Sequence, residues 1–557
     1  MTGYDYISKF FEKYGVSHVF YQEAVLRVLM REIEKKGDKA ATKFILAHSE
    51  QAAGCMADGY ARASGKPGVC MCQSIGAGNM VGAIYDAWLA NTPLVCVTAK
   101  KTPVYQYKNS YQETDHRLLY EAVTKFNGEA IEGEQIPFLF RNCFQQATTG
   151  KARPTHIDIT DHQGHVAEMA EVGTDTGFEP VYGNYPAYRP TAPKEAVEEA
   201  VKALKAAKKP LLIAGRGATY SGAGEELVAL ATKIDAPIVT SPDGKGLMDE
   251  TDPLWSGIVG NYGMDCANRS AANADLCVFI GTQTADQTTL DWQCPPKSTK
   301  CIQIDIDASE LGKNYTDTIG LPGDAKAVLT QLLEAAPEMK HADWRKEVAG
   351  YVKATLDEYD ERINRVEESG LVRQERLCSE IMKAVPDDAV IVADTGYSAQ
   401  WSATMMRTKK TQKYFRAAGS LGWAFPASLG AKCACPDKEV ICFAGDGAMF
   451  YYLPEMETAH RYGIKTITIV NNNNALGQSA SGLTVVNKEM PDKGARHFRF
   501  TAPSFSQLAK TFGLNAIEVH SPEEIGPAIK AAMAAKEGTV IEVHTIEQNF
   551  CAPAFRK

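Results

Sequence analysis

Long hydrophobic runs are absent from the 557-residue sequence. None approaches the roughly 20 apolar residues that a membrane-spanning helix needs, and the start, MTGYDYISKFFEKYG, is too charged for a secretion signal. A basic run is also missing and the net charge is -9, which argues against nucleic acid as the main partner. We therefore expect a cytoplasmic protein that binds a small molecule, with no membrane and no nucleic acid among its partners.

The cysteines lack the pattern of a disulfide framework or a zinc knuckle. The 14 cysteines are scattered along the chain, which is typical of reduced thiols in an intracellular protein. Two C-x-C pairs, Cys70/Cys72 and Cys433/Cys435, have no second pair at zinc spacing, so we expect them to be core residues. Short repeats and low-complexity tracts are absent as well, which excludes a repeat array.

Three regions alternate short β-branched runs with alanine-rich helical stretches. This alternation is typical of α/β layers built on parallel sheets, and the hydrophobic and charged fractions, 45% and 23%, are those of a globular chain. We expect three doubly wound parallel-sheet domains over residues 1–180, 190–340 and 365–557. A proline-rich linker near residue 180 and a charged helical connector after residue 340 separate them.

The segment VICFAGDGAMFYYLPEMETAHRYGIKTITIVNNNN, residues 440–474, reads as strand, helix and strand. A right-handed crossover makes the two strands parallel, so Asp446 and the asparagine run meet at one edge of the sheet. A carboxylate and an amide oxygen suit Mg²⁺, which fills its other positions with water and phosphate oxygens. Gly445 and Gly447 let backbone N–H groups approach a phosphate. The segment therefore predicts a magnesium-diphosphate site, although a plain turn and a solvated loop are the alternatives.

The same segment resembles the thiamine diphosphate motif, in which Gly-Asp-Gly is followed by Asn-Asn after a helix and a strand. The resemblance implies Asp446, the Asn473 side chain and the Ala475 carbonyl as magnesium ligands, with Asn472 as the other choice of asparagine. The residues that it implies for binding the cofactor here are Gly445, Gly447, Ala448 and Asn473.

Two further segments of the third region resemble parts of this family. AAGSLGWAFPASLGAK resembles the segment that holds the aminopyrimidine ring, which implies roles for the Gly419 carbonyl and for the N–H and side chain of Leu421. ADTGYSAQW follows a predicted strand and implies that Gly396 and Ser398 bind the diphosphate.

The first region carries the expected catalytic acid. FILAHSEQAAGCMADGYARASGKPGV resembles the helix of the family that bears the activating glutamate, which assigns Glu50. Such an acid, bonded to a nitrogen of the aminopyrimidine, helps C2 of the thiazolium lose its proton. Without the resemblance, Ser49 and Glu50 are explained more simply as caps of a helix.

The substrate end of the site departs from the acetolactate synthase pattern. YQETDH resembles the Phe-Gln-Glu segment of the family and places Gln112 near the substrate as a second catalytic residue. FYQEAV stands where acetolactate synthases have Gly-Pro-Gly-Gly, so Glu23 and its neighbours are expected at the mouth. The residues expected to line the substrate pocket are Tyr21, Gln22, His48, Tyr111, His116 and Gln478, of which His48 and Gln478 are also explained as ordinary core or rim residues.

The middle region resembles the nucleotide-type domain of acetolactate synthases, which carry FAD there. The sequence has QTADQ, Gln283 to Gln287, where that pattern has Arg-Phe-Asp-Asp-Arg. The loss of the arginines leaves FAD possible but doubtful, and a purely structural middle domain is the alternative.

Taken as a whole, the resemblance implies an enzyme that uses thiamine diphosphate and Mg²⁺. It would decarboxylate a 2-oxo acid, join it to a second carbonyl compound, or do both. A lyase acting on a 2-hydroxy ketone or a 2-hydroxyacyl thioester is the alternative, and a non-catalytic cofactor-binding scaffold is a more remote one. The family also implies a homodimer or homotetramer with its active sites between subunits.

Overall fold

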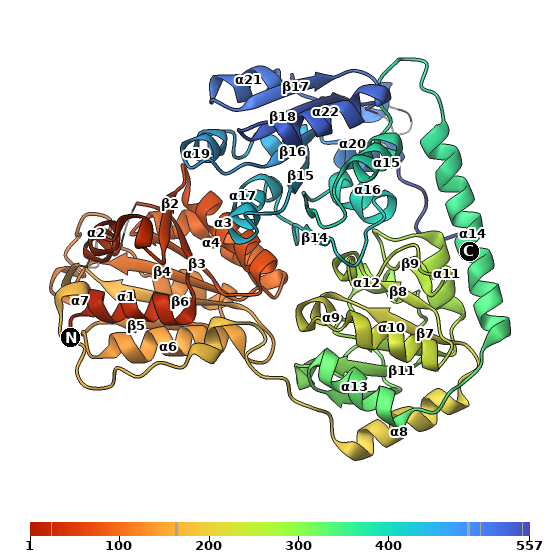
Figure 1. Cartoon of the computed structure of the whole chain (residues 1–557), viewed down its shortest axis with the longest axis horizontal. Coiled ribbons are helices and arrows are strands. Elements are labelled where there is room, and N and C mark those ends of the chain that lie inside the picture. The colour runs from red at the N-terminus through yellow and green to blue at the C-terminus, as the bar shows by residue number, and fades with distance from the viewer. Residues whose placement is uncertain are drawn as a thin grey trace.

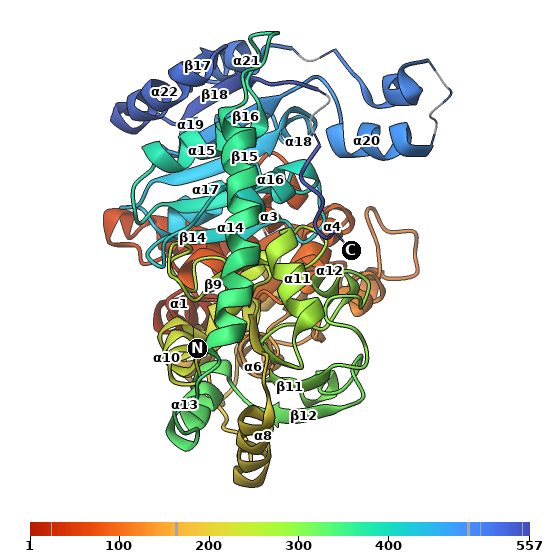
Figure 2. The ribbon, with the colours of Figure 1, turned by 90° about the vertical axis from the view of Figure 1, so that its right-hand side faces the viewer.

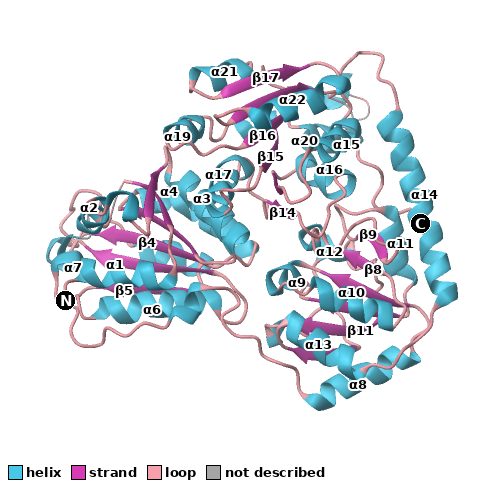
Figure 3. Cartoon of the chain, viewed as in Figure 1, coloured by secondary structure: helices cyan, strands magenta, loops and turns pink. Residues whose placement is uncertain are grey.

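A computed structural model describes residues 1–23, 25–161, 165–486, 489, 491–501, 503–547 and 550–556. The chain forms three six-stranded parallel sheets in sequence order (Figure 1). Helices cover the sheets, as Figure 3 shows. The expected α/β class with three parallel-sheet domains is therefore confirmed. Among the described residues, no helix is both long and apolar enough to cross a membrane.

The first sheet has the order β2-β1-β3-β4-β6-β5. Its strands are β1 (His18–Gln22), β2 (Lys43–Leu46), β3 (Gly68–Gln73), β4 (Leu94–Lys100), β5 (Phe126–Ala130) and β6 (Pro154–Thr160). The helices of this domain are α1 (Gly3–Tyr14), α2 (Arg27–Glu34), α3 (Glu50–Ser64), α4 (Gly76–Leu89), α5 (His116–Tyr120), α6 (Gln135–Thr148) and α7 (His165–Met169).

The second sheet has the order β12-β11-β10-β7-β8-β9, which is that of a doubly wound nucleotide-binding fold. Its strands are β7 (Pro210–Ala214), β8 (Ile238–Thr240), β9 (Trp255–Ile258), β10 (Leu276–Ile280), β11 (Lys300–Asp305) and β12 (Thr318–Pro322). The helices are α8 (Lys194–Ala206), α9 (Arg216–Ser221), α10 (Gly224–Lys233), α11 (Asp265–Asn273), α12 (Asp286–Thr289) and α13 (Ala325–Ala335). The long connector α14 (Ala342–Asn364) follows and runs along the outside of the middle and third domains (Figure 2).

The third sheet, β14-β13-β15-β16-β18-β17, repeats the strand order of the first. Its strands are β13 (Val390–Ala393), β14 (Lys413–Arg416), β15 (Val440–Gly445), β16 (Ile467–Asn472), β17 (Asn515–Val519) and β18 (Thr539–His544). The helices are α15 (Gln374–Ala384), α16 (Tyr397–Met405), α17 (Ala424–Ala434), α18 (Asp446–Met449), α19 (Glu455–Arg461), α20 (Gly477–Val486), α21 (Phe505–Thr511) and α22 (Pro522–Ala534).

The central strands are apolar along nearly their whole length. Every residue of β4, β7, β10 and β13 is buried, because both faces of a parallel sheet are covered by helices. Polar residues consequently gather just beyond the carboxyl ends of the strands, where the chain leaves the sheet. That edge is where open α/β sheets bind ligands.

The first and third domains meet through a close contact between α3 and α17. A Cβ atom on Gly59 would lie 2.0 Å from the Ala427 carbonyl oxygen, and one on Gly430 would lie 1.8 Å from the Met56 carbonyl oxygen. Any side chain at either glycine would therefore push the two helix backbones apart. This contact places the start of α3, where Glu50 lies, beside the third domain of the same chain.

Candidate active site

A cavity of about 290 Å³ opens in the third domain, at the carboxyl ends of β13, β15 and β16. The two strands of the Gly-Asp-Gly motif are neighbours in the sheet, with Gly445 opposite Asn471. The structure brings together the cofactor and metal residues expected in this domain. Those that line the cavity are Gly396, Ser398, Gly419, Leu421, Gly445, Asp446, Gly447, Ala448, Asn473 and Ala475.

Asp446 lies at the start of α18 with its carboxylate directed at backbone N–H groups. The Gly447 N–H donates to Oδ1 at 2.8 Å and the Asn473 N–H donates to Oδ2 at 3.1 Å. Burial raises the pKa of Asp446 to about 6, against the lowering effect of these bonds. The Asn473 Oδ1 accepts the N–H of Ala475 at 3.2 Å, so the three expected ligands form one local arrangement.

Two buried acids that the sequence did not single out fix the loop carrying Gly419 and Leu421. Asp394, just after β13, accepts the N–H groups of Thr395, Gly422 and Ala424 at 2.8–3.0 Å. Burial raises the pKa of Asp394 to about 6. An acid directly after a buried strand was a usable signal for this residue.

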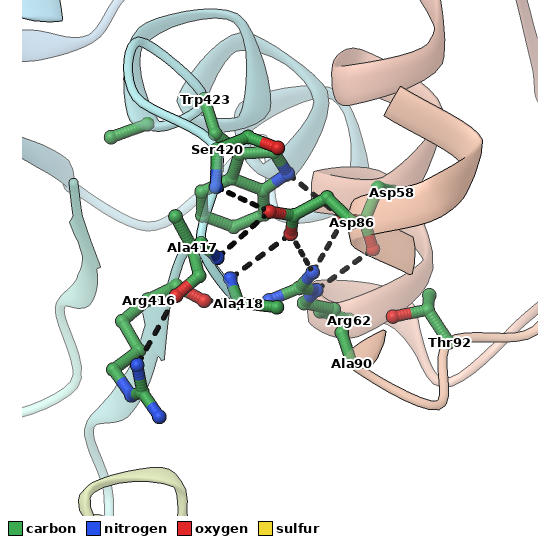
Figure 4. Close-up of polar contacts among 12 residues, drawn as sticks. Asp58, Arg62, Asp86, Ala90, Thr92, Arg416, Ala417, Ala418, Ser420 and Trp423 are labelled. Atoms are coloured by element: carbon green, nitrogen blue, oxygen red, sulfur yellow. Dashed lines mark hydrogen bonds and ion pairs between the residues drawn. The ribbon is translucent and has the colours of Figure 1, made fainter. Parts of the chain in front are cut away.

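The second acid comes from the first domain. Asp86 of α4 accepts the N–H groups of Ala418, Gly419 and Ser420 at 2.8–3.1 Å (Figure 4).

Arg62 of α3 links Asp86 to a third buried acid, Asp58. It contacts Asp86 at 3.2 Å and Asp58 at 2.8 Å, and Asp58 also accepts the Trp423 indole N–H at 2.8 Å (Figure 4). All these charged side chains are buried. Buried side chains of the first domain therefore hold in place the loop at the expected aminopyrimidine position.

One residue that lines the cavity contacts the middle domain. The Gln478 side-chain N–H donates to the Tyr262 hydroxyl at 3.1 Å, and the Tyr262 ring lies 5.9 Å from the Arg416 guanidinium. Further lining residues that the sequence analysis missed are Gln374, Thr395, Tyr397, Trp401, Asn471, Leu476, Gly477 and Ser479. Thr395, Tyr397 and Trp401 lie in the segment ADTGYSAQW and Asn471 lies in the asparagine run, but the resemblance pointed to other residues of those segments.

The cavity suits a magnesium-bound diphosphate. Its possible metal ligands are a carboxylate, an amide oxygen and a backbone carbonyl, which are hard oxygen donors of the kind that Mg²⁺ takes. A Cβ atom on Gly445 would approach no atom closer than 3.6 Å, and one on Gly419 would meet none within 4 Å. The backbone is therefore open toward the cavity at both positions.

Glu50 lies outside this cavity, at the carboxyl edge of the first sheet. It is the first residue of α3, and its Oε2 accepts the Asn79 side-chain N–H at 3.2 Å. Ser49 caps the helix through the Ala52 N–H at 3.0 Å, so the capping role belongs to Ser49. The Glu50 carboxylate is left facing the N-terminal turn of α4, where a Cβ atom on Gly76 would lie 2.6 Å from its Oε1. No described residue of the first domain lines the cavity of its own chain.

The expected substrate residues come from the first and third domains. Only Gln478, which belongs to the third domain, lines the cavity. Tyr21 and Gln22 end β1, and Tyr111 and Gln112 lie on the loop after β4, with Tyr111 75% exposed.

The two histidines have other partners. His48 is exposed and contacts Glu457 of α19 at 2.6 Å. His116 is fully buried, and its ring nitrogens contact Asp158 and the Ser74 carbonyl. Because both nitrogens are already bonded, the expected substrate contact of His116 does not fit its position.

The middle domain has a second cavity, of about 330 Å³, at the switch point between β7 and β10. Its cations are engaged by acids: Asp243 contacts Arg216 at 2.6 Å and Arg416 at 3.1 Å. Lys151 contacts Glu310 at 2.9 Å. Asp305, at the end of β11, also lines the cavity, and burial raises its pKa to about 6.

Comparison with known proteins agrees with these sites. The chain matches three family models: the N-terminal TPP binding domain of thiamine pyrophosphate enzymes over residues 1–119, the central domain over 197–332 and the C-terminal TPP binding domain over 394–543.

Individual relatives match over most of the chain. A probable acetolactate synthase large subunit of Methanococcus aeolicus is 30% identical over 523 residues, which cover 89% of this chain and 85% of the relative. The acetolactate synthase large subunit of Corynebacterium glutamicum is 31% identical, over 90% of this chain and 80% of its own. A sulfoacetaldehyde acetyltransferase of Castellaniella defragrans is 29% identical, over 90% and 87%. The chain therefore belongs to the thiamine pyrophosphate enzyme family, as an acetolactate synthase-like enzyme that depends on this cofactor.

Proposed function

We propose that the enzyme uses thiamine diphosphate and Mg²⁺ to break or form a carbon–carbon bond next to the carbonyl of a 2-oxo acid. The observation that carries the proposal is the single cavity in which the diphosphate, metal and aminopyrimidine residues converge. Bound thiamine diphosphate would supply a carbon nucleophile at C2 of its thiazolium ring. The relatives named acetolactate synthase and sulfoacetaldehyde acetyltransferase support transfer of a two-carbon or larger acyl unit to an acceptor.

Each part of the chain has a distinct task in this proposal. Asp446, Asn473 and the Ala475 carbonyl hold Mg²⁺, and the backbone from Gly445 to Ala448 with Gly396 and Ser398 binds the diphosphate. The Gly419 carbonyl and Leu421 position the aminopyrimidine, with their loop held by Asp86 and Asp394.

The acid and the polar substrate contacts come from the first domain. Glu50 of the partner subunit holds a proton at the aminopyrimidine nitrogen, and Gln112 of the partner subunit contacts the substrate. In this proposal, each active site combines the metal and diphosphate residues of one chain with the acid of the other chain.

Product analysis with pyruvate tests the reaction. With Mg²⁺ and thiamine diphosphate present, we expect loss of CO₂ and, with an added aldehyde or a second 2-oxo acid, a new hydroxy ketone or hydroxy acid. Omitting either cofactor component should abolish the product. Absence of CO₂ release from a panel of 2-oxo acids would contradict the 2-oxo acid as donor.

A lyase of a 2-hydroxy ketone or 2-hydroxyacyl thioester is the second candidate. It is favoured by the polar side chains of Gln22 and Glu23 at the end of β1, in the stretch that is Gly-Pro-Gly-Gly in acetolactate synthases. These side chains offer hydrogen bonds to hydroxyl groups that glycine and proline cannot make. Cleavage of such a substrate without CO₂ release would distinguish this reaction.

An exposed apolar surface beside Glu50 supports a homodimer. Ile75, Tyr85 and Leu89 on and before α4 are 50–69% exposed, and Val104 and Tyr107 on the loop after β4 are 66% and 96% exposed. A patch of this kind is typical of a protein interface. Figure 2 shows the orange loop after β4 and helix α20 projecting from the same side of the molecule. A second copy related by a two-fold axis would cover this side and bring Glu50 of the partner subunit to the cavity.

We therefore expect a homodimer, or a tetramer built from two dimers. Sedimentation velocity of the protein loaded with cofactor and Mg²⁺ should show no active monomer. Replacing the exposed Tyr85 with glutamate should shift the protein toward monomer and lower its activity in the same proportion. An active species of 60.6 kDa would contradict the shared site.

We also expect little or no FAD. The charges around the middle cavity support this, because its two arginines pair with Asp243 and leave no unengaged cation among them for a dinucleotide's diphosphate. The absorbance spectrum of the purified protein should lack the bands of stoichiometric flavin. One flavin per chain would show that Asp305 and the loop at Gly217 provide sufficient contacts.

A further inference from the structure

His116 holds two parts of the first domain together from a fully buried position. Its Nδ1 lies 3.0 Å from Asp158 Oδ1 on β6, and its Nε2 lies 2.8 Å from the Ser74 carbonyl oxygen. Burial opposes the charge on Asp158, whereas the hydrogen bond to His116 holds the pKa of that carboxyl below its ordinary value. Both ring nitrogens are therefore engaged by buried oxygen atoms that come from two different parts of the domain.

Ser74, the residue that His116 contacts, has an unusual backbone. Its φ is +49°, in the left-handed region that residues other than glycine seldom adopt. Its hydroxyl donates to the Gln112 carbonyl at 2.5 Å, and Gln112 has a φ of +59°. Two residues with left-handed backbones thus bond to each other, and one of them, Ser74, also bonds to His116. Strain of this kind persists only where the surroundings impose it, and it concentrates at functional sites.

The Ser74 turn leads directly to the contacts of Glu50. Ala77 donates its N–H to the Ser74 carbonyl at 3.0 Å, which fixes where α4 begins. Gly76 and Asn79, in the first turn of α4, are the residues that lie against the Glu50 carboxylate. Any shift of the turn would therefore displace the surroundings of Glu50 and the loop of Gln112 together.

We propose that His116 is a positioning residue, which holds Glu50 and Gln112 in their relative positions through the Ser74 turn. It touches neither substrate nor cofactor. The inference rests on the proposed function for the roles of Glu50 and Gln112, whereas the hydrogen bonds of the ring do not depend on that function.

The first test compares His116→Gln with His116→Phe in the enzyme loaded with thiamine diphosphate and Mg²⁺. The amide of glutamine donates at any pH, whereas phenylalanine donates at none. We expect cofactor affinity to stay within about two-fold of wild type. Proton exchange at C2 without substrate should fall by up to about 10²-fold in His116→Phe, the cost of a misplaced catalytic group. It should fall less in His116→Gln.

A matched control distinguishes positioning from general stabilisation. His341→Phe is suitable, because His341 also has both ring nitrogens against carbonyls, of Ile234 and Ala207, but lies in the middle domain. Its C2 exchange should equal that of wild type. Equal losses of exchange in His116→Phe and His116→Gln, or no loss in either, would overturn the proposal.

Ser74→Gly offers a second variant that keeps the fold, because glycine tolerates the positive φ. It removes only the hydroxyl bond to Gln112, so C2 exchange should persist while KM for the 2-oxo acid rises. A normal KM would contradict the link between Ser74 and Gln112.

A spectroscopic measurement tests the ring independently of activity. In protein labelled with ¹⁵N-histidine, the signals missing from His116→Gln belong to His116, and the hydrogen on Nε2 should exchange slowly with solvent because it is bonded to the buried Ser74 carbonyl. Fast exchange of that hydrogen would overturn the proposal even in an active enzyme. Slow exchange in a protein without C2 exchange would instead place the failure with the proposed function.

Discussion

Replacing Glu50 with glutamine is expected to lower turnover by about two or more orders of magnitude, the scale of one positioned acid or base. Glutamine keeps the size of the side chain and its contact with Asn79 but cannot deliver a proton to the aminopyrimidine nitrogen. The residues that we propose to hold the diphosphate and the metal line the third-domain cavity, and Glu50 is not among the residues that line it. Cofactor binding should therefore persist while C2 proton exchange becomes slow.

Exchange of the C2 proton without substrate, followed by NMR with saturating cofactor, measures this effect directly. Glu32→Gln is a suitable control, because Glu32 is a surface residue of the same domain whose contacts are Arg31 and Lys35, and it should exchange at the wild-type rate. Near wild-type exchange in Glu50→Gln would show that the assignment is wrong and that the residue serves only the start of α3. The same assay excludes a catalytically silent scaffold if the wild type exchanges rapidly.

Replacing Asp446 with alanine should act on cofactor retention before chemistry. The change removes a carboxylate expected to bind Mg²⁺ and the acceptor of the Gly447 and Asn473 N–H groups. Because even residues that only orient metal ligands are worth about 10- to 100-fold in affinity, we expect a loss of at least this size. Titration with thiamine diphosphate at fixed Mg²⁺, followed by calorimetry, measures it.

Excess cofactor separates this variant from the first. Raising thiamine diphosphate and Mg²⁺ should partly restore the activity of Asp446→Ala and leave Glu50→Gln slow. Asp437→Ala, on the exposed turn before β15, is the matched control and should bind normally. Unchanged cofactor affinity in Asp446→Ala would mean that the metal is held elsewhere.

The sequence was sufficient to predict that the expected third-domain residues lie close together, because they lie at or after the carboxyl ends of strands of one sheet. Asp446 after β15 and Asn473 after β16 are neighbours as soon as the strands are parallel and adjacent, and the structure has them so. The predicted α/β class followed from the same patterns of buried strands and intervening helices.

The contacts between domains could not be predicted in this way. Asp86 lies within an apolar stretch of α4, and nothing near it in the sequence shows that it accepts three N–H groups more than 330 positions away. His116 was expected in the substrate pocket because it lies in the segment YQETDH, but the fold buries its side chain against Asp158. Local sequence patterns predict which polar residues follow a strand, whereas the partners of a buried charged side chain depend on how whole domains pack.

The arrangement of the active site between chains is tested most directly by mixing two inactive variants. In a dimer of one Glu50→Gln chain and one Asp446→Ala chain, one site would combine an intact Glu50 with an intact Asp446, and the other site would carry both changes. Random pairing of equal amounts should therefore recover about a quarter of wild-type C2 exchange, with isolated mixed dimers at about a half. If mixed dimers, isolated by two affinity tags, remain as inactive as either parent, Glu50 and Asp446 do not act across the subunit interface.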